Sequence, residues 1–335
     1  MLLVVFMHFD EMFYARFATW DVAEDAWDTL SSAARPARIP AFFLISGILA
    51  APALKRSWRA IVEKRIAIQY YTFALWSFIH VFTLYALYTP LDGAALAELI
   101  PRYGWNLIWA NSQVWFLWAL VVFFLIALAF HKIPTIAVAL AAVMFLAAEQ
   151  VDDLILMQVL RSLVFFLAGC YFPAFAKRLG DRLGLPMVGA LLLAYMVSVG
   201  AILLVGEKTF GIWLPATLFG VALFFQISTW LTSTPLVAPL SYVGRQTLPI
   251  YVMHGIILMV FSAISRKNDW TFGTSIGGRI GDAILPVVGN IAVVAACLGL
   301  YVLFRQIGLN WLFNPPERMI AALRGKPSRE FKMSS

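Results

Sequence analysis

The sequence has little charge for its length. Charged residues make up 13% of the 335 residues, whereas hydrophobic residues make up 62%, and the mean hydropathy is +0.83. A water-soluble domain has about 25% charged and about 45–50% apolar residues. The low charge therefore excludes an ordinary soluble globule, an intrinsically disordered chain and a collagen-like repeat. It indicates a protein that crosses a membrane several times.

Cysteine is nearly absent, and several cofactor motifs are missing altogether. Only Cys170 and Cys297 occur, each inside an apolar segment, and we interpret them as small packing residues. The sequence has no Walker loop, no HExxH, no CxxC pair and no GxGxxG after a strand. These absences give no support to an ATPase, a zinc hydrolase or a redox enzyme, and we expect neither a metal nor a bound cofactor.

Apolar runs long enough to span a bilayer recur from end to end of the chain. A helix needs about 20 mainly apolar residues to cross the hydrocarbon core. Ten such runs occur, at about 1–17, 39–54, 66–89, 113–130, 133–148, 155–176, 186–205, 211–231, 241–265 and 283–304. We therefore predict an all-α polytopic membrane protein with about ten transmembrane helices. It comprises one membrane domain over 1–304 and a basic cytoplasmic tail over 305–335.

The distribution of basic residues predicts the orientation. When the connections are assigned alternately to two sides, 16 of the 25 Lys and Arg residues fall on the side of the amino terminus. Eight fall on the other side, and Arg161 lies inside a span. Because basic loops stay inside, both termini are predicted to be cytoplasmic. This clustering of the positive charge also points to anionic membrane lipid, and not nucleic acid, as the partner.

The first predicted span begins abruptly. Met1 already lies in an apolar run, and no positively charged segment precedes it. The run before His8 is too short for a signal peptide. We expect that the chain begins late and lacks part of its first helix.

A few polar residues stand in apolar surroundings, where a charge costs about 2.5–3.5 kcal/mol at a helix centre. His8 follows Leu-Leu-Val-Val-Phe-Met; it is either satisfied by a nearby carbonyl or serves as a proton acceptor. Arg38 precedes Pro40 and is either a snorkelling cation or holds a carboxylate, a phosphate or an oxyanion. Ser46 lies near mid-membrane, where small residues permit close helix packing.

Three later residues can likewise have either a structural or a functional role. Arg161 lies in an otherwise apolar stretch and must find an anion or a water-filled cavity. His254 lies in the ninth span after Pro249, which we expect to kink the helix and free a carbonyl. Trp115 fits an interfacial aromatic belt as well as a binding site.

Four stretches carry a family resemblance when they are taken in order. They are Leu-Leu-Val-Val-Phe-Met-His8, Arg38-x-Pro-x-Phe-Phe-Leu-Ile-Ser46-Gly47, Val-Trp115-Phe-Leu-Trp-Ala-Leu and Ser-Tyr-Val-Gly-Arg-Gln-Thr-Leu-Pro-Ile-Tyr251-Val-Met-His254. Together they resemble the acyltransferase 3 family of bacterial integral-membrane acyltransferases. The resemblance spans nearly the whole chain, and the family's usual ten helices agree with the spans counted above.

The resemblance implies transfer of an acyl group, commonly acetyl, from cytoplasmic acyl-CoA to a hydroxyl of a glycan, lipid-linked sugar or other envelope acceptor. The enzyme would lie in the bacterial inner membrane, with acyl-CoA as a donor substrate and not as a bound cofactor. His8 would take the proton of the acceptor hydroxyl, and Arg38 would hold the donor or the tetrahedral oxyanion. The remaining residues expected to bind substrate are Ser46, Trp115, Arg161, Tyr251 and His254.

The sequence departs from the family pattern in two places. A basic residue that the family usually places eleven positions before the histidine would fall before Met1. Ile68 stands where the second arginine of a cytoplasmic Arg-x-x-Arg is expected. We therefore expect the donor phosphates to be bound by a group of basic residues in this loop, namely Lys55, Arg56, Arg59, Lys64 and Arg65.

Two other functions compete with the enzyme. Arg161, His254 and the Pro249 kink also suit a transporter or flippase for an envelope glycan or lipid, because transporters place broken helices and charges at the midplane. No inverted repeat accompanies these residues. The missing amino-terminal basic residue is compatible with an inactive acyltransferase homologue that acts as a membrane scaffold.

Overall fold

Helices make up most of the computed structural model, which describes residues 1–57, 61–89, 93–268, 276–317 and 319–320, and no strand occurs among these residues. In chain order the α-helices are α1 (Leu2–Phe9), α2 (Ala15–Phe17), α3 (Asp21–Ala50), α5 (Ala67–Tyr88), α6 (Gly93–Trp109), α7 (Trp115–Ala129), α8 (Pro134–Ala147), α9 (Leu154–Tyr171), α10 (Pro173–Lys177), α11 (Leu185–Val205), α12 (Trp213–Leu231), α13 (Val237–Arg245), α14 (Thr247–Lys267) and α15 (Ile276–Gln306).

Each of the predicted apolar ranges coincides with helical structure, which confirms an all-α polytopic membrane protein. Within the described residues, seven helices are long and apolar enough to cross a membrane: Asp21–Lys55, Ala67–Tyr88, Leu154–Tyr171, Leu185–Val205, Trp213–Leu231, Thr247–Lys267 and Gly277–Gln306. Helices α7 and α8 are apolar but shorter. The cytoplasmic location of the termini stays a prediction.

The connection between the first two predicted spans is itself helical and forms the first half of α3. Trp27 on this half donates a hydrogen bond to the Ala283 carbonyl of α15 (3.1 Å), and its ring packs on Phe6 of α1. The helix continues through Pro36 and Pro40, although each proline removes one backbone hydrogen bond. Packing against α1 and α15 therefore extends α3 well beyond its apolar run.

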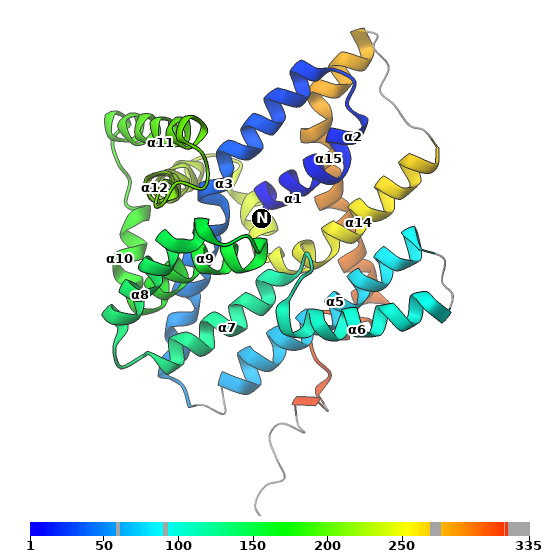
Figure 1. Ribbon diagram of the computed structural model, residues 1–335, viewed down its shortest axis with the longest axis horizontal. Helices are drawn as coiled ribbons and strands as arrows, with labels where there is room; N and C mark the ends of the chain where they lie inside the picture. The colour runs from blue at the N-terminus through cyan, green and yellow to red at the C-terminus, as the bar shows by residue number, and fades with distance from the viewer. Residues whose placement is uncertain (58–60, 90–92, 269–275, 318, 321–335) are drawn as a thin grey trace, which may run out of the picture.

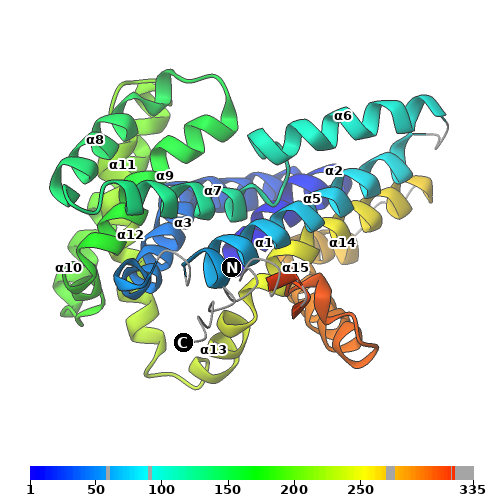
Figure 2. The ribbon, with the colours of Figure 1, turned by 90° about the horizontal axis from the view of Figure 1, so that it is seen from below.

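The amino-terminal helix lies at the centre of the bundle (Figure 1). Helix α1 contacts α3, α14 and α15. On one side, α9 packs on α3 and α8, and α12 packs on α3 and α11. On the other side, α5 lies beside α14, with α6 along it (Figure 2). A histidine on α1 is therefore enclosed by helices from both halves of the chain.

Helices α3 and α9 meet backbone to backbone through two glycines. A Cβ atom at Gly47 would clash with the Phe166 carbonyl oxygen, and one at Gly169 would clash with the Leu44 carbonyl oxygen. Small residues allow this close approach between membrane helices. The contact sets the position of Ser46, which precedes Gly47 on α3.

The proline of the ninth predicted span lies at a helix start and does not kink the helix. Helix α13 ends at Arg245, and α14 begins at Thr247, so that Pro249 falls in the first turn of α14. The missing N–H of a first-turn proline costs no intrahelical bond, because the first N–H groups of a helix have no partner within it. The break in the chain direction therefore lies at Gln246, before the proline.

Candidate functional site

Two histidines that the sequence singled out lie side by side. The ring centroids of His8 on α1 and His254 on α14 are 5.2 Å apart. His8 is followed by a π-helical turn over Asp10–Tyr14, a feature that is frequent at functional sites. Within it, Glu11 brings Oε2 to 3.7 Å from His8 Nδ1. The carboxylate can therefore stabilise a positive charge on the His8 ring.

A third histidine, which the sequence reasoning missed, joins this pair. His80 on α5 hydrogen-bonds through Nε2 to the Val252 carbonyl (2.9 Å), and its Cε1 lies against Gly255, the residue after His254. His80 lies inside the predicted span over 66–89, so the rule that singled out His8 and His254 could have found it. Three of the four histidines in the sequence thus converge from three helices.

The carbonyl contacts fix the tautomers of the two buried histidines. His254 Nδ1 lies 3.0 Å from the Ile250 carbonyl oxygen, and a carbonyl can only accept a hydrogen bond. Nδ1 of His254 and Nε2 of His80 therefore carry the protons in the neutral rings. The other ring nitrogens, Nε2 of His254 and Nδ1 of His80, have no hydrogen-bond partner in the described part of the chain. Each leaves a lone pair in the cluster.

Tyr251 secures the loop that precedes α7. Its hydroxyl donates to the Gln113 carbonyl (2.8 Å) and accepts from the Phe116 amide (3.1 Å). The Gln113 side-chain oxygen then lies against Gly255, where a Cβ would collide with it. Trp115, the first residue of α7, packs near Phe43 of α3 (6.0 Å between ring centroids). Tyr251 thus positions Gln113 beside the histidines. Gln113 is a residue that the sequence did not single out.

Arg38 lies against the turn of α1 that leads to His8. Its Nη1 donates to the Leu3 carbonyl (3.4 Å), and its Nη2 contacts the Met7 sulfur. The residue is buried, and its Nε has no partner among the described residues. The structure therefore places a buried guanidinium, with a free donor, next to the helix that carries His8.

One cavity lies at the amino-terminal end of α5. It has a volume of about 220 Å³ and is lined by Ser46, Leu49, Arg65, Gln69, Leu120, Phe124 and Phe166. Arg65 donates to the Leu49 carbonyl (2.6 Å) and lies over the Phe124 ring (5.4 Å). Ser46 and Arg65, two residues expected to contact substrate, thus share one cavity, which we call the inner cavity.

A second cavity lies at the other end of α5, and two of the residues that line it are neighbours of the histidine cluster. It has a volume of about 280 Å³. Its lining includes Tyr88 at the end of α5, and Met12 and Gln113, which are joined by a hydrogen bond (3.0 Å). Met12 lies one turn beyond His8, and Gln113 contacts Gly255. We call it the outer cavity.

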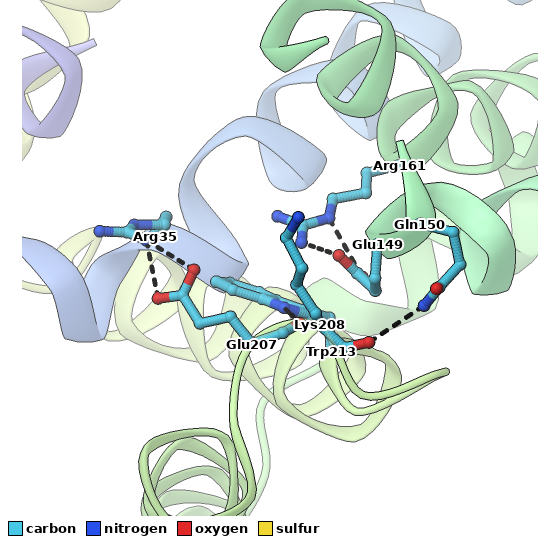
Figure 3. Close-up of polar contacts among 7 residues, drawn as sticks. All are labelled: Arg35, Glu149, Gln150, Arg161, Glu207, Lys208 and Trp213. Atoms are coloured by element: carbon cyan, nitrogen blue, oxygen red, sulfur yellow. Dashed lines mark hydrogen bonds and ion pairs between the residues drawn. The ribbon is translucent and has the colours of Figure 1, made fainter. Parts of the chain in front are cut away.

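Arg161 lies outside the histidine cluster, and its anionic partner is Glu149. It forms a buried ion pair with Glu149 and lies over the Trp213 ring (4.0 Å), as Figure 3 shows for the pair and its neighbours. Nearby, Lys208 pairs with Asp152 (2.7 Å), and its hydrogen bond lowers the pKa of that carboxyl below the ordinary value. The structure therefore places Arg161 in a polar contact that joins α9 and α12 to the turn that follows α8.

The basic residues expected to bind donor phosphates are placed only in part. Lys55 and Arg56 are exposed just after α3, and Arg65 lines the inner cavity. Arg59 and the side chain of Lys64 lie outside the described residues.

Comparison with known proteins gives a family and one relative. The family model described as an acyltransferase domain matches residues 1–305. The chain is 28% identical over 339 residues to the inner membrane protein YcfT of Escherichia coli (strain K12), covering 94% of this chain and 92% of that protein. No solved structure matches the chain.

Proposed function

The chain belongs to the acyltransferase 3 family, and we propose that it is an O-acyltransferase of the bacterial inner membrane. The donor is cytoplasmic acyl-CoA, commonly acetyl-CoA, and the acceptor is a hydroxyl of a glycan, lipid-linked sugar or other envelope molecule. One observation carries the proposal: His8, His80 and His254 converge near the cavity at one end of α5, while a cavity that Arg65 lines lies at the other end.

The histidine cluster supplies the proton acceptor. His8 is partly accessible, with 19% of its side chain exposed, so that an acceptor hydroxyl can reach it. As the hydroxyl oxygen attacks the thioester carbonyl carbon, His8 takes the hydroxyl proton. The new C–O bond replaces the C–S bond, and the proton passes to the departing thiolate. Glu11, 3.7 Å away, stabilises the imidazolium between these steps.

Three buried side chains are suited to orient the acceptor and to stabilise the reacting carbonyl. The lone pairs on His80 and His254 can accept hydrogen bonds from other hydroxyl groups of the acceptor and so orient the attacking one toward His8. The free Nε donor of Arg38 can stabilise the oxyanion of the tetrahedral intermediate. Because Arg38 is buried, its charge acts at low dielectric, where electrostatic stabilisation is stronger than in water.

The inner cavity is suited to the donor. Arg65, with the exposed Lys55 and Arg56 nearby in sequence, can pair with the phosphates of CoA. The apolar walls formed by Leu120, Phe124 and Phe166 suit the acyl and pantetheine part.

The test is acyl transfer by the purified protein in nanodiscs, followed as acceptor-dependent release of free CoA. Envelope glycans and lipids from cells with and without the gene, compared by mass spectrometry, identify the acceptor by its added acyl mass. His8→Ala is expected to lower turnover by about 10²–10⁴-fold. His131→Ala is the matched control, because His131 is exposed and bonds only to the Leu128 carbonyl within the described chain.

Two results would contradict the proposal. Equal turnover of His8→Ala and wild type would remove His8 from the mechanism. Substrate flux across proteoliposomes without any acyl donor would favour a transporter instead.

A further inference from the structure

The outer cavity carries positive charge that no acid among the described residues neutralises. Arg16 of α2 and Arg266 of α14 both line it, and no Asp or Glu belongs to the lining. Within the described chain, neither arginine lies in an ion pair. The Arg266 guanidinium lies over the Tyr88 ring at 5.9 Å, and Tyr88 also lines the cavity. The cavity thus presents two cations to whatever occupies it.

Two other cations on the side of the membrane opposite the predicted side of the amino terminus are paired. Arg35 bonds to Glu207 at 3.1 Å (Figure 3), and Lys208 bonds to Asp152 at 2.7 Å. The structure therefore supplies carboxylate partners elsewhere on this side. The outer cavity differs from these two sites in that its two arginines have no carboxylate partner among the described residues.

Neutral polar groups in the same cavity are also free. The side-chain oxygens of Gln113 and Ser262 are buried and have no hydrogen-bond partner among the described residues. A buried polar atom without a partner costs about 1–3 kcal/mol, so that a ligand supplying hydrogen bonds is favoured there. Because both side chains line the cavity, a small rotation of either one would bring its oxygen to a ligand hydroxyl.

From these features we infer that the outer cavity binds an acceptor that bears both hydroxyl groups and an anionic group, a carboxylate or a phosphate. Arg16 and Arg266 bind the anion, because a guanidinium matches these oxyanions with two parallel hydrogen bonds. Gln113 and Ser262 bind hydroxyl groups. The cavity volume of about 280 Å³ accommodates one sugar-sized unit of the acceptor. This inference rests on the proposed function and specifies its acceptor.

Binding of small probes tests the inference without any acyl donor. The probes are D-glucuronate, D-glucose 6-phosphate, D-glucose and dihexanoyl phosphatidylglycerol, each titrated against nanodisc-embedded protein by saturation-transfer NMR. We expect the anionic probes to bind at least about tenfold more tightly than glucose. Tighter binding of the lipid assigns the anion to a headgroup, and tighter binding of the sugars assigns it to a soluble or glycan acceptor.

Variants locate the binding. Arg16→Gln and Arg266→Gln should each reduce the affinity for the anionic probes to the level of glucose. Lys267→Gln is the matched control, since Lys267 is the exposed neighbour of Arg266, carries the same charge and does not line the cavity. Equal binding of charged and neutral probes would overturn the inference. So would a loss in Lys267→Gln as large as that in Arg266→Gln.

The two proposals can fail separately. If the anionic probes bind but no acyl transfer can be detected, the proposal that the protein is an acyltransferase is refuted. The inference that the outer cavity binds anions then still stands. If acyl transfer to a neutral acceptor proceeds at the same rate in Arg266→Gln and wild type, the anionic acceptor is refuted. The proposal that the protein is an acyltransferase then still stands.

Discussion

His254 of α14 lies next to His8 of α1, with their ring centroids 5.2 Å apart, although the two residues stand near opposite ends of the chain. His254 is fully buried, and its Nδ1 is held by the Ile250 carbonyl within its own helix. Its Nε2 is left free in the cluster. We propose that His254 uses this free nitrogen to position the acceptor beside His8.

Substitution of His254 by Asn separates that role from packing. The Asn amide can still donate to the Ile250 carbonyl, but it has no counterpart of Nε2. We expect the melting temperature to stay near that of wild type while kcat falls about a hundredfold. The pH–rate profile of the variant should also change, because a group near His8 is lost. A loss of activity that only follows the folded fraction would contradict this role.

Arg65→Gln should weaken donor binding. The substitution removes a cation from the inner cavity while leaving the histidine cluster untouched. Because phosphate binding contributes equally to the ground state and the transition state, KM for acyl-CoA should rise about tenfold with kcat little changed. Lys132→Gln, an exposed basic residue in another connection, serves as the control. An unchanged KM would exclude Arg65 from the donor site.

Gly169→Ala should destabilise the fold. The added Cβ would collide with the Leu44 carbonyl oxygen and lie 2.8 Å from the Ile48 amide nitrogen, so α3 and α9 would have to separate. Such overpacking costs about 1–3 kcal/mol and would lower the melting temperature in detergent. Gly189→Ala on α11, where a Cβ meets no atom within 4 Å, should leave the melting temperature unchanged or raise it. Equal melting temperatures for both variants would refute the close contact.

Arg161→Leu should act on stability. It leaves Glu149 buried without its counter-ion, and breaking a buried pair in this way costs about 3–5 kcal/mol. The double variant Arg161→Leu, Glu149→Leu removes both charges and should recover most of that loss. If the double variant folds and keeps its KM for the acceptor, Arg161 does not bind substrate. A raised KM for the acceptor in a stable double variant would instead support substrate binding by Arg161.

Hydropathy and charge in the sequence determined the class of the protein and the places of its spans. These properties are local: an apolar run must be helical in a bilayer, because no water satisfies its backbone groups. The cost of burying an ionisable group also marked His8 and His254 as candidates without any structure. The same rule applied to His80 would have completed the cluster.

The tertiary structure alone decided which of these residues meet. No local pattern shows that Arg161 is neutralised by Glu149, or that Ser46 and Arg65 line one cavity, since these contacts join separate helices. The helical first half of α3 and the placement of Gln113 by Tyr251 likewise depend on packing between segments far apart in the chain. Hydropathy reports how a segment partitions between lipid and water, whereas partners across a bundle are fixed by how helices pack on one another.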